Sequence, residues 1–343
     1  MSNKDTQIAL VSSKRSSLAR RATELLAKRG LEDLVSQEDA EVWFQKAKKL
    51  YEAVPKNLPV AEFRAALGKF FVCIQNAASI DPYNSEIQYW FGFAYRYGLG
   101  TKQNRIEATK WFRKAAIQGV AQAQYELGSM LSYGDAVKQN QSEAVYWYEM
   151  AANQGQVDAQ LALGVAYGDG TGVDYDLVES MRWFRQAAEQ NSVDAQFFLA
   201  EALAEGRGTQ KNLGEAAEWY YKAASQGMAE AQFRLGLMFK KGDGVSRNPI
   251  QAAEWFRKAV IQEHHLAQLA LGMMLLNGDG VSPDHEEAVR LIQKTAEEGN
   301  MGAQFLLSSL YSKGQGVPKD TQKSQFWFRQ SQATQNRISK HEE

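Results

Sequence analysis

The 343-residue sequence contains only one cysteine, Cys73, so no disulfide can form within the chain and a disulfide-stapled secreted scaffold is excluded. Its 39 lysines and arginines nearly balance 40 aspartates and glutamates, which argues against a protein that coats nucleic acid or an anionic membrane. No apolar run approaches the about 18 residues of a transmembrane helix, and the N-terminus lacks an apolar core of signal-peptide length. These absences predict a cytoplasmic protein with no nucleic-acid partner and no stable membrane insertion.

The positive signal in the sequence is a repeat with a period of 36 residues. One position of this register carries glycine seven times in seven, another carries alanine followed by glutamine, and a third holds six of the eight tryptophans. The residues in register are Gly98, Gly134, Gly170, Gly206, Gly242, Gly278 and Gly314; Ala123, Ala159, Ala195, Ala231, Ala267 and Ala303; and Trp111, Trp147, Trp183, Trp219, Trp255 and Trp327. This agreement identifies a tandem repeat protein.

One unit has the pattern of two helices. In residues 121–153, Ala123 and Leu127 share one face of a helix that we expect to end at Gly134, because glycine adopts a left-handed conformation without steric cost. The second helix presents one apolar face of Ala144, Trp147, Tyr148, Ala151 and Ala152. Small residues are expected to let the two helices approach closely, with the tryptophan filling the remaining gap. Such units bury their apolar faces only by stacking, so the predicted fold is all-α: an α-solenoid, a right-handed superhelix of stacked helix-turn-helix repeats.

The full repeat follows the pattern A-x-A-Q-x-x-L-G-x-x-Y-x-x-G-x-G-V and then A-x-x-W-[YF]-x-K-A-A-x-x-G, which residues 231–263 show well. This pattern resembles the Sel1-like repeat, a relative of the tetratricopeptide repeat. The resemblance covers seven units over residues 86–330, with departures at Ala200, Leu291 and Ser308. It implies protein–protein scaffolding without naming a partner. Two other roles linked to the family stay open: hydrolysis of cell-wall or β-lactam compounds, and host interaction by a bacterial effector exported without a Sec signal.

Three segments lie outside the repeats. Residues 1–36 form a basic tail that is either solvated or carries a short amphipathic helix for docking a partner. Residues 37–85 resemble a helical tetratricopeptide-like cap, because residues 81–84 read Asp-Pro-Tyr-Asn, like the D-P-x-N turn of that family. Within this cap, Cys73 is expected to be a buried core thiol. Residues 331–343 are predicted to be a polar C-terminal tail that frays.

No catalytic or metal-binding constellation stands out in the sequence. The four histidines, His264, His265, His285 and His341, are expected in loops and at helix starts, and antiparallel helices would hold the first and third about 20 Å apart. Residues 168–176 lack the D-x-D-x-D-G order and the late glutamate of a calcium loop. No Gly-Lys-Ser/Thr follows the repeat glycines, so a phosphate loop is not predicted either. We therefore predict a non-enzymatic protein with no cofactor and no metal.

The better candidate for function is the surface of the first helices, which line the concave side in the related tetratricopeptide geometry. The predicted partner-binding residues are Tyr89, Phe93, Arg96, Tyr97, Tyr125, Ser129, Tyr133, Asp158, Asp169, Asp194, Phe197, Glu201, Glu205, Phe233, Lys240 and Lys241. Some of the aromatic members are alternatively expected to be buried between neighbouring units. The set changes from aromatic through acidic to basic along the chain, which favours a segment with a basic stretch flanked by apolar residues.

The glutamine of each Ala-Gln pair is expected to serve structure instead, by tying stacked units together through its amide. Taken together, the residues favour a cytoplasmic, non-enzymatic scaffold or adaptor that binds a protein or peptide in the concave groove. No motif supports the hydrolase alternative, and the residues do not reveal whether the chain is exported as an effector.

Overall fold

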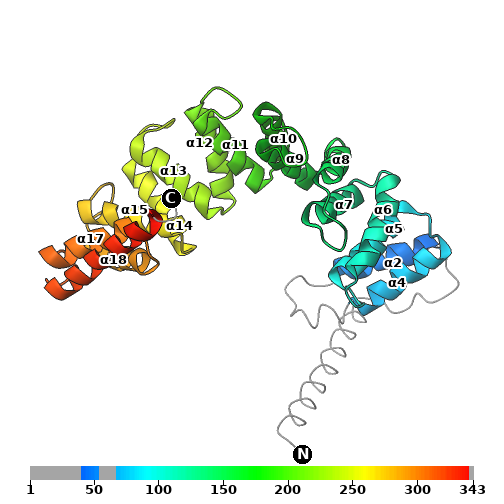
Figure 1. Cartoon of the computed structure of the whole chain (residues 1–343), viewed down its shortest axis with the longest axis horizontal. Coiled ribbons are helices and arrows are strands. Elements are labelled where there is room, and N and C mark those ends of the chain that lie inside the picture. The colour runs from blue at the N-terminus through cyan, green and yellow to red at the C-terminus, as the bar shows by residue number, and fades with distance from the viewer. Residues whose placement is uncertain (1–39, 54–66, 340–343) are drawn as a thin grey trace, which may run out of the picture. The chain divides into compact units, whose positions relative to one another are not determined.

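The structure is a computed structural model that describes residues 40–53 and 67–339, and within these ranges it contains sixteen α-helices and no strand (Figure 1). The predicted all-α class and α-solenoid fold are confirmed. The chain divides into two compact units, Met1–Tyr175 and Asp176–Glu343. The predicted basic tail, the start of the cap and His341 lie outside the described residues.

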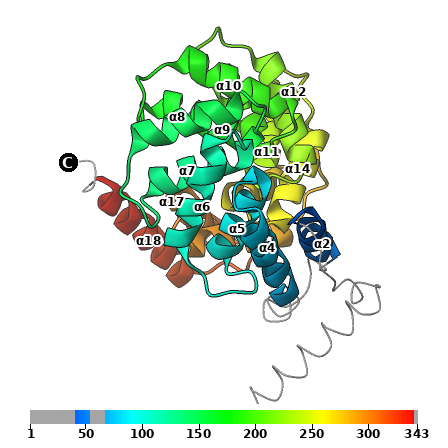
Figure 2. The same cartoon turned by 90° about the vertical axis from the view of Figure 1, so that its right-hand side faces the viewer.

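In the first unit, helices α2 and α4 precede the repeats and pack against each other, as Figures 1 and 2 show. Its helices are α2 (Ala40–Ala53), α4 (Gly68–Ile80), α5 (Ser85–Tyr97), α6 (Arg105–Ile117), α7 (Ala121–Tyr133), α8 (Gln141–Ala152) and α9 (Val157–Asp169). Those of the second unit are α10 (Leu177–Glu189), α11 (Val193–Glu205), α12 (Leu213–Ser225), α13 (Ala229–Lys241), α14 (Pro249–Ile261), α15 (His265–Asn277), α16 (His285–Glu297), α17 (Met301–Lys313) and α18 (Thr321–Ser339).

Side-chain caps and glycines in register set the helix boundaries. Each first helix of a repeat ends at the predicted glycine, with φ between +66° at Gly98 and +86° at Gly242. Each second helix begins after an asparagine or aspartate whose side-chain oxygen accepts a backbone hydrogen bond, as Asn140 does from Glu143 at 3.2 Å. These caps are Asn104, Asn140, Asp176, Asn212, Asn248, Asp284 and Asp320. The caps repeat every 36 residues, like the glycines.

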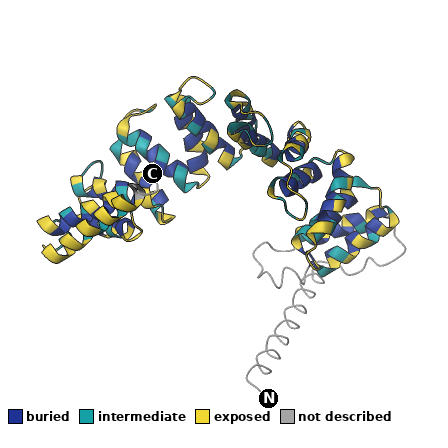
Figure 3. Cartoon of the chain, viewed as in Figure 1, coloured by how far each residue is buried: buried dark blue, intermediate teal, exposed yellow. Residues whose placement is uncertain are grey.

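The core lies between the helices, where alanines and leucines of the repeat are buried (Figure 3). The two helices of a repeat approach at the Leu-Gly glycine, as predicted, but the tryptophan does not fill the gap. A Cβ on Gly128 would lie 2.8 Å from the ring of Tyr148, and Gly236 faces Phe256 in the same way. In these repeats the aromatic residue after the tryptophan therefore fills the space. Trp147 is buried beside it and donates to Glu143 at 3.4 Å.

The repeated glutamines are buried and form a ladder of amides, which confirms their structural role. The Nε2 of Gln124 donates to the carbonyl of Ala116 on the preceding repeat at 3.0 Å. Its Oε1 accepts from Gln154, at the end of the second helix of its own repeat, at 2.8 Å. Corresponding amide pairs, 30 residues apart, are Gln118–Gln88 in the first unit and Gln226–Gln196 and Gln262–Gln232 in the second. Gln124, Gln196 and Gln232 thus each link three helix ends that belong to two repeats.

The ends of the described chain agree with the sequence in part. Asp81 accepts hydrogen bonds from the backbone of Tyr83 and Asn84, both at 3.2 Å, which forms the predicted turn before α5. Cys73 is buried in α4, as expected. The predicted fraying tail is wrong over residues 331–339, because α18 continues through Ser339, and residues 340–343 lie outside the described residues. Thr334 in this extension donates to the ladder residue Gln304 at 3.1 Å, so the last helix is tied to its own repeat. Among the described residues, no helix is both long and apolar enough to cross a membrane.

Candidate binding surface

An aromatic column runs along α5 in the first unit. Tyr89, Phe93 and Tyr97 are spaced four residues apart, so they lie on one face of the helix. The ring centroids of Phe93 and Tyr97 are 4.7 Å apart, and those of Tyr89 and Phe93 are 6.0 Å apart. Tyr51 of α2 packs edge-on against Phe93 at 5.8 Å. The column is half-buried at Tyr89 and reaches 46% exposure at Tyr97.

A buried ion pair stands beside this column and joins α5 to α7. The Nη1 of Arg96 lies 2.5 Å from Oε2 of Glu126, and these side chains are 17% and 10% exposed. Tyr97 also donates to the Glu126 carboxylate. Burial raises the pKa of Glu126, and the Arg96 charge offsets only part of that shift. Arg96 is therefore committed to Glu126 within the molecule, whereas sequence reasoning treated it as a free partner contact.

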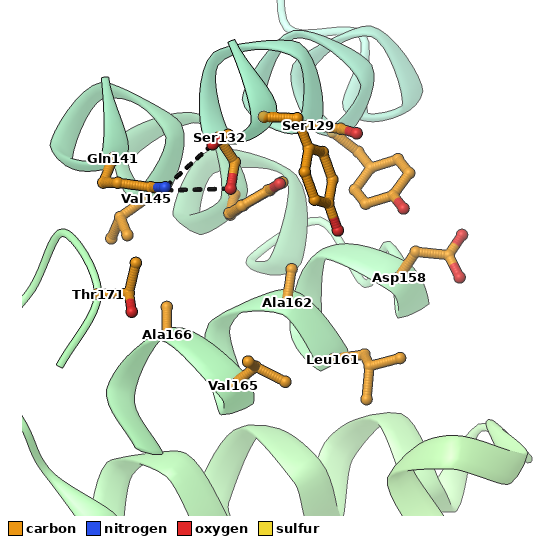
Figure 4. A pocket seen from close by; sticks show the side chains of 13 residues that line it. Ser129, Ser132, Gln141, Val145, Asp158, Leu161, Ala162, Val165, Ala166 and Thr171 are labelled. Carbon is orange, nitrogen blue, oxygen red and sulfur yellow. Dashed lines mark hydrogen bonds between the residues drawn. The ribbon is translucent and has the colours of Figure 1, made fainter. Parts of the chain in front are cut away.

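A cavity of about 290 Å³ opens between α7 and α9. Four predicted residues line it: Tyr125, Ser129 and Tyr133 from α7 and Asp158 from the first turn of α9. Figure 4 shows Asp158 at one end of the cavity and Thr171 near the other. The structure thus brings together part of the predicted set. Asp169, by contrast, is exposed at the end of α9 and does not line the cavity.

In the second unit, a chain of charged side chains crosses the first helices. Arg234 of α13 pairs with Glu201 of α11 at 3.4 Å and with Glu230 of its own helix at 2.8 Å. His264, at the start of α15, pairs with Glu230 at 2.7 Å and stacks on the ring of Phe233 at 4.8 Å. Burial acts to raise the pKa of Glu230, but hydrogen bonds from His264 and Arg234 outweigh it and lower that pKa.

The predicted acidic stretch is therefore partly neutralised in the second unit. Glu201 faces Arg234, and it also accepts a hydrogen bond from Tyr220. Glu205 pairs with Arg207 at 2.9 Å. Sequence reasoning missed both arginines, although Arg234 directly precedes the Leu235-Gly236 pair of a first helix. Asp194 is exposed and forms no ion pair among the described residues.

The remaining predicted residues differ in accessibility. Phe233 is buried at 7% exposure, and Ser129 is similarly buried at 8%. Phe197 is half-buried against Tyr220, with ring centroids 5.8 Å apart. Lys240 is half-buried and Lys241 is exposed at the end of α13. The groove residues thus include both solvent-facing side chains and supports beneath them.

The described residues offer little for catalysis. Within these ranges, no group of three or more His, Cys, Asp or Glu side chains is placed to hold a metal ion. His264 acts as a helix cap, because its Nδ1 accepts from the backbone of Ala267 at 3.2 Å. His265 contacts Glu298, and His285 begins α16, as predicted. A second cavity, of about 330 Å³, lies between α17 and α18 and is lined by Phe305, Phe328 and several serines.

Comparisons with known proteins agree with the repeat architecture. The model of the Sel1 repeat matches residues 85–120, 121–156, 157–192, 193–228, 229–264, 265–300 and 302–331. The comparison with curated proteins gave no significant match. Among solved structures, c5321, described as a protective antigen present in uropathogenic Escherichia coli strains and displaying an SLR fold, is 28% identical with a TM-score of 0.78. That match covers 93% of this chain and 64% of the E. coli chain, so this chain spans about two thirds of its relative. A Sel1 repeat protein from Oxalobacter formigenes is also 28% identical, with a TM-score of 0.61 over 92% of this chain and 88% of that chain.

Proposed function

The chain belongs to the Sel1 repeat family, whose members are generally protein-interaction scaffolds, and we propose that it is a non-catalytic scaffold or adaptor that binds a protein or peptide along its first helices. The observation that carries this proposal is the contrast between two positions of the repeat. The buried glutamine is the same in all seven units. The last residue of the first helix varies instead through Tyr97, Tyr133, Asp169, Glu205 and Lys241.

All five of these variable residues are exposed, with Tyr133 at 82% and Tyr97 at 46%. Exposed aromatic side chains are costly to leave in water, and such residues are enriched where proteins bind each other. Buried residues that are the same in every repeat, combined with exposed residues that differ between repeats, are expected of a surface that fits one partner.

The charge of the exposed side chains supports a partner with a basic stretch flanked by apolar residues. Asp158 and Asp169 are exposed in the first unit, and Asp194 is exposed in the second. Aromatic side chains of α5 and α7 would contact the apolar flank. The lone, buried thiol of Cys73 fits the cytoplasmic location that belongs to the same proposal.

The proposal is tested by affinity capture from the native cell with the full chain as bait. The test variant combines Tyr97→Ala, Tyr133→Ala and Asp194→Ala, and leaves Glu201 in place because it supports Arg234. The control is Tyr83→Ala, which removes an equally exposed tyrosine from the turn before α5. A partner that is lost with the triple variant and kept with the control supports the proposal. Equal recovery of the same partners by all three baits contradicts it.

A further inference from the structure

The cavity between α7 and α9 is open, whereas side chains of the protein itself fill two corresponding places in other repeats. At the corresponding place between α5 and α7, the guanidinium of Arg96 occupies the space and pairs with Glu126. Between α11 and α13 of the second unit, the guanidinium of Arg234 plays the same part and pairs with Glu201. In the register of the repeat, Ser132 stands where Arg96 stands one unit earlier. The short serine leaves the space open, so no long cationic side chain lies between α7 and α9.

The cavity carries negative charge without a balancing cation. Asp158 is the one charged residue among those that line it. Its Oδ2 accepts a hydrogen bond from the amide of Gln156 at 3.1 Å, but Asp158 forms no ion pair within the described ranges. Burial raises the pKa of Tyr125 to about 12, and the charges of Asp158 and Glu126 add to that shift. The one charged group on the lining is thus a carboxylate with no cationic partner of its own, which favours a cation from outside.

The walls suit the stem of a long side chain. Leu161 and Val165 of α9 present aliphatic groups along one side, and the serines of α7 lie across from them (Figure 4). The rings of Tyr125 and Tyr133 also line the cavity and offer faces to a cation. Val165 is 39% exposed and Tyr133 is 82% exposed, so the cavity opens to solvent. Lysine and arginine bury their aliphatic stems on such surfaces while the charged group finds a polar partner.

We propose that this cavity receives a lysine or arginine side chain of the bound partner, with the stem on Leu161 and Val165 and the cation at Asp158. The partner would thereby supply the charge that Arg96 supplies between α5 and α7 and that Arg234 supplies between α11 and α13. This inference rests on the proposed function, because it identifies one anchor of the same bound segment.

The anchor is tested with small probes that carry the side-chain chemistry alone. Butylammonium and butylguanidinium represent the two side chains, 1-pentanol is the neutral control and pentanoate is the anionic control. Backbone amide NMR signals of Ser129, Ser132 and Val165 report binding to the full chain. Both cations should give saturable shifts at these signals, and pentanol and pentanoate should bind more weakly.

Two variants and a matched control decide the outcome. Asp158→Asn keeps the shape and the Gln156 hydrogen bond, and should weaken binding of both cations about fivefold. Ser132→Arg places an internal guanidinium in the cavity, as in the preceding repeat, and should abolish binding. Asp194→Asn changes the residue at the same register position one repeat later and should leave binding unchanged. Circular dichroism confirms that each variant is folded.

Unchanged cation binding in Asp158→Asn, or pentanol binding equal to that of the cations, would overturn the anchor. These measurements need no partner, so they separate the two proposals. If the cations bind the cavity but affinity capture finds no partner that depends on Tyr97 and Tyr133, the scaffold proposal is contradicted and the anchor is not. If a captured partner depends on those tyrosines but the cavity shows no specific binding of the cations, the anchor is contradicted and the scaffold proposal is not.

Discussion

Gln154 donates a hydrogen bond from its Nε2 to the Oε1 of Gln124 at 2.8 Å, and Gln124 in turn donates to the carbonyl of Ala116 at 3.0 Å. Gln124 is 1% exposed, so its own amide depends on these two partners and not on water. One side chain therefore connects a repeat to its own second helix and to the repeat before it.

Replacement of Gln124 by leucine should destabilise the protein. The variant removes two hydrogen bonds of the Gln124 side chain, while the Ala116 carbonyl keeps its bond from the Gly119 backbone and Gln154 keeps its bond to Met150. A net intramolecular hydrogen bond is worth about 0.5–1.5 kcal/mol, so the two together set the scale of the loss. Urea unfolding followed by circular dichroism measures the loss. The control is Gln122→Leu, because Gln122 is exposed on the same helix. Equal effects of the two substitutions would contradict a specific role for the ladder.

Two glycines with positive φ should respond differently to alanine. Gly244 has φ +71°, and a Cβ there would lie 2.2 Å from the backbone oxygen of Leu213. Gly227 has φ +100°, and nothing lies within 4 Å of its Cβ position. Both substitutions strain the backbone, but only Gly244→Ala also forces the chain apart, so it should cost about 1–3 kcal/mol more. Thermal and urea unfolding of the two variants give the difference, and a larger loss in Gly227→Ala would refute the close approach.

Two carboxylates should affect stability with opposite dependence on pH. Burial raises the pKa of Glu126 above the ordinary value of 4.5 despite the Arg96 charge, so its contribution is present at low pH and is lost as the pH rises. Compared with Glu126→Gln, the wild type should therefore gain free energy of unfolding as the pH falls toward 4.5, and the difference should level off below that value.

The pKa of Glu230 shifts the other way, because hydrogen bonds from His264 and Arg234 outweigh its burial. Its contribution is present above the ordinary pKa of 4.5 and is lost below it. The advantage of the wild type over Glu230→Gln should accordingly shrink as the pH falls. Urea unfolding across a pH series distinguishes the two carboxylates. If the stability difference between wild type and variant changes with pH in the same direction for Glu126→Gln and Glu230→Gln, the opposite pKa shifts are contradicted.

His264 should contribute to stability mainly as the cap of α15. Asparagine occupies the same register position at Asn300, where it accepts from the backbone of Ala303 at 2.9 Å. His264→Asn should therefore keep the cap while losing the contacts to Glu230 and Phe233, and His264→Ala should lose all three. We expect the alanine variant to be less stable than the asparagine variant by about 1 kcal/mol in thermal unfolding. Equal stability of the two variants would assign the role of His264 to its ion pair and ring stack instead.

The sequence was sufficient for the features that every repeat uses identically. The glycine register located the ends of the first helices, and the Ala-Gln register located the buried amides. Identical packing needs identical residues, so such positions appear directly as a period. The aromatic residue that faces Gly128 was misassigned, because Trp147 and Tyr148 are adjacent and both are buried.

Features that join different repeats were harder to predict. Arg96 and Arg234 stand at different register positions, yet each pairs with a glutamate of a neighbouring first helix. Such pairs depend on how the helices stack, and the period gives no measure of that. The helical extension of α18 was also missed, because its residues are polar and its tie to Gln304 is a hydrogen bond rather than an apolar contact.

The amide ladder also fixes the step by which this chain can change its length. Each described amide bridge joins residues 30 positions apart, inside a period of 36. Loss or gain of one whole repeat, as in recombination between two copies of the same DNA segment, returns every remaining glutamine to an equivalent neighbour. A change of any other length breaks the register at the junction. The gene can therefore lengthen or shorten the row of first helices by one 36-residue module at a time while the fold is retained.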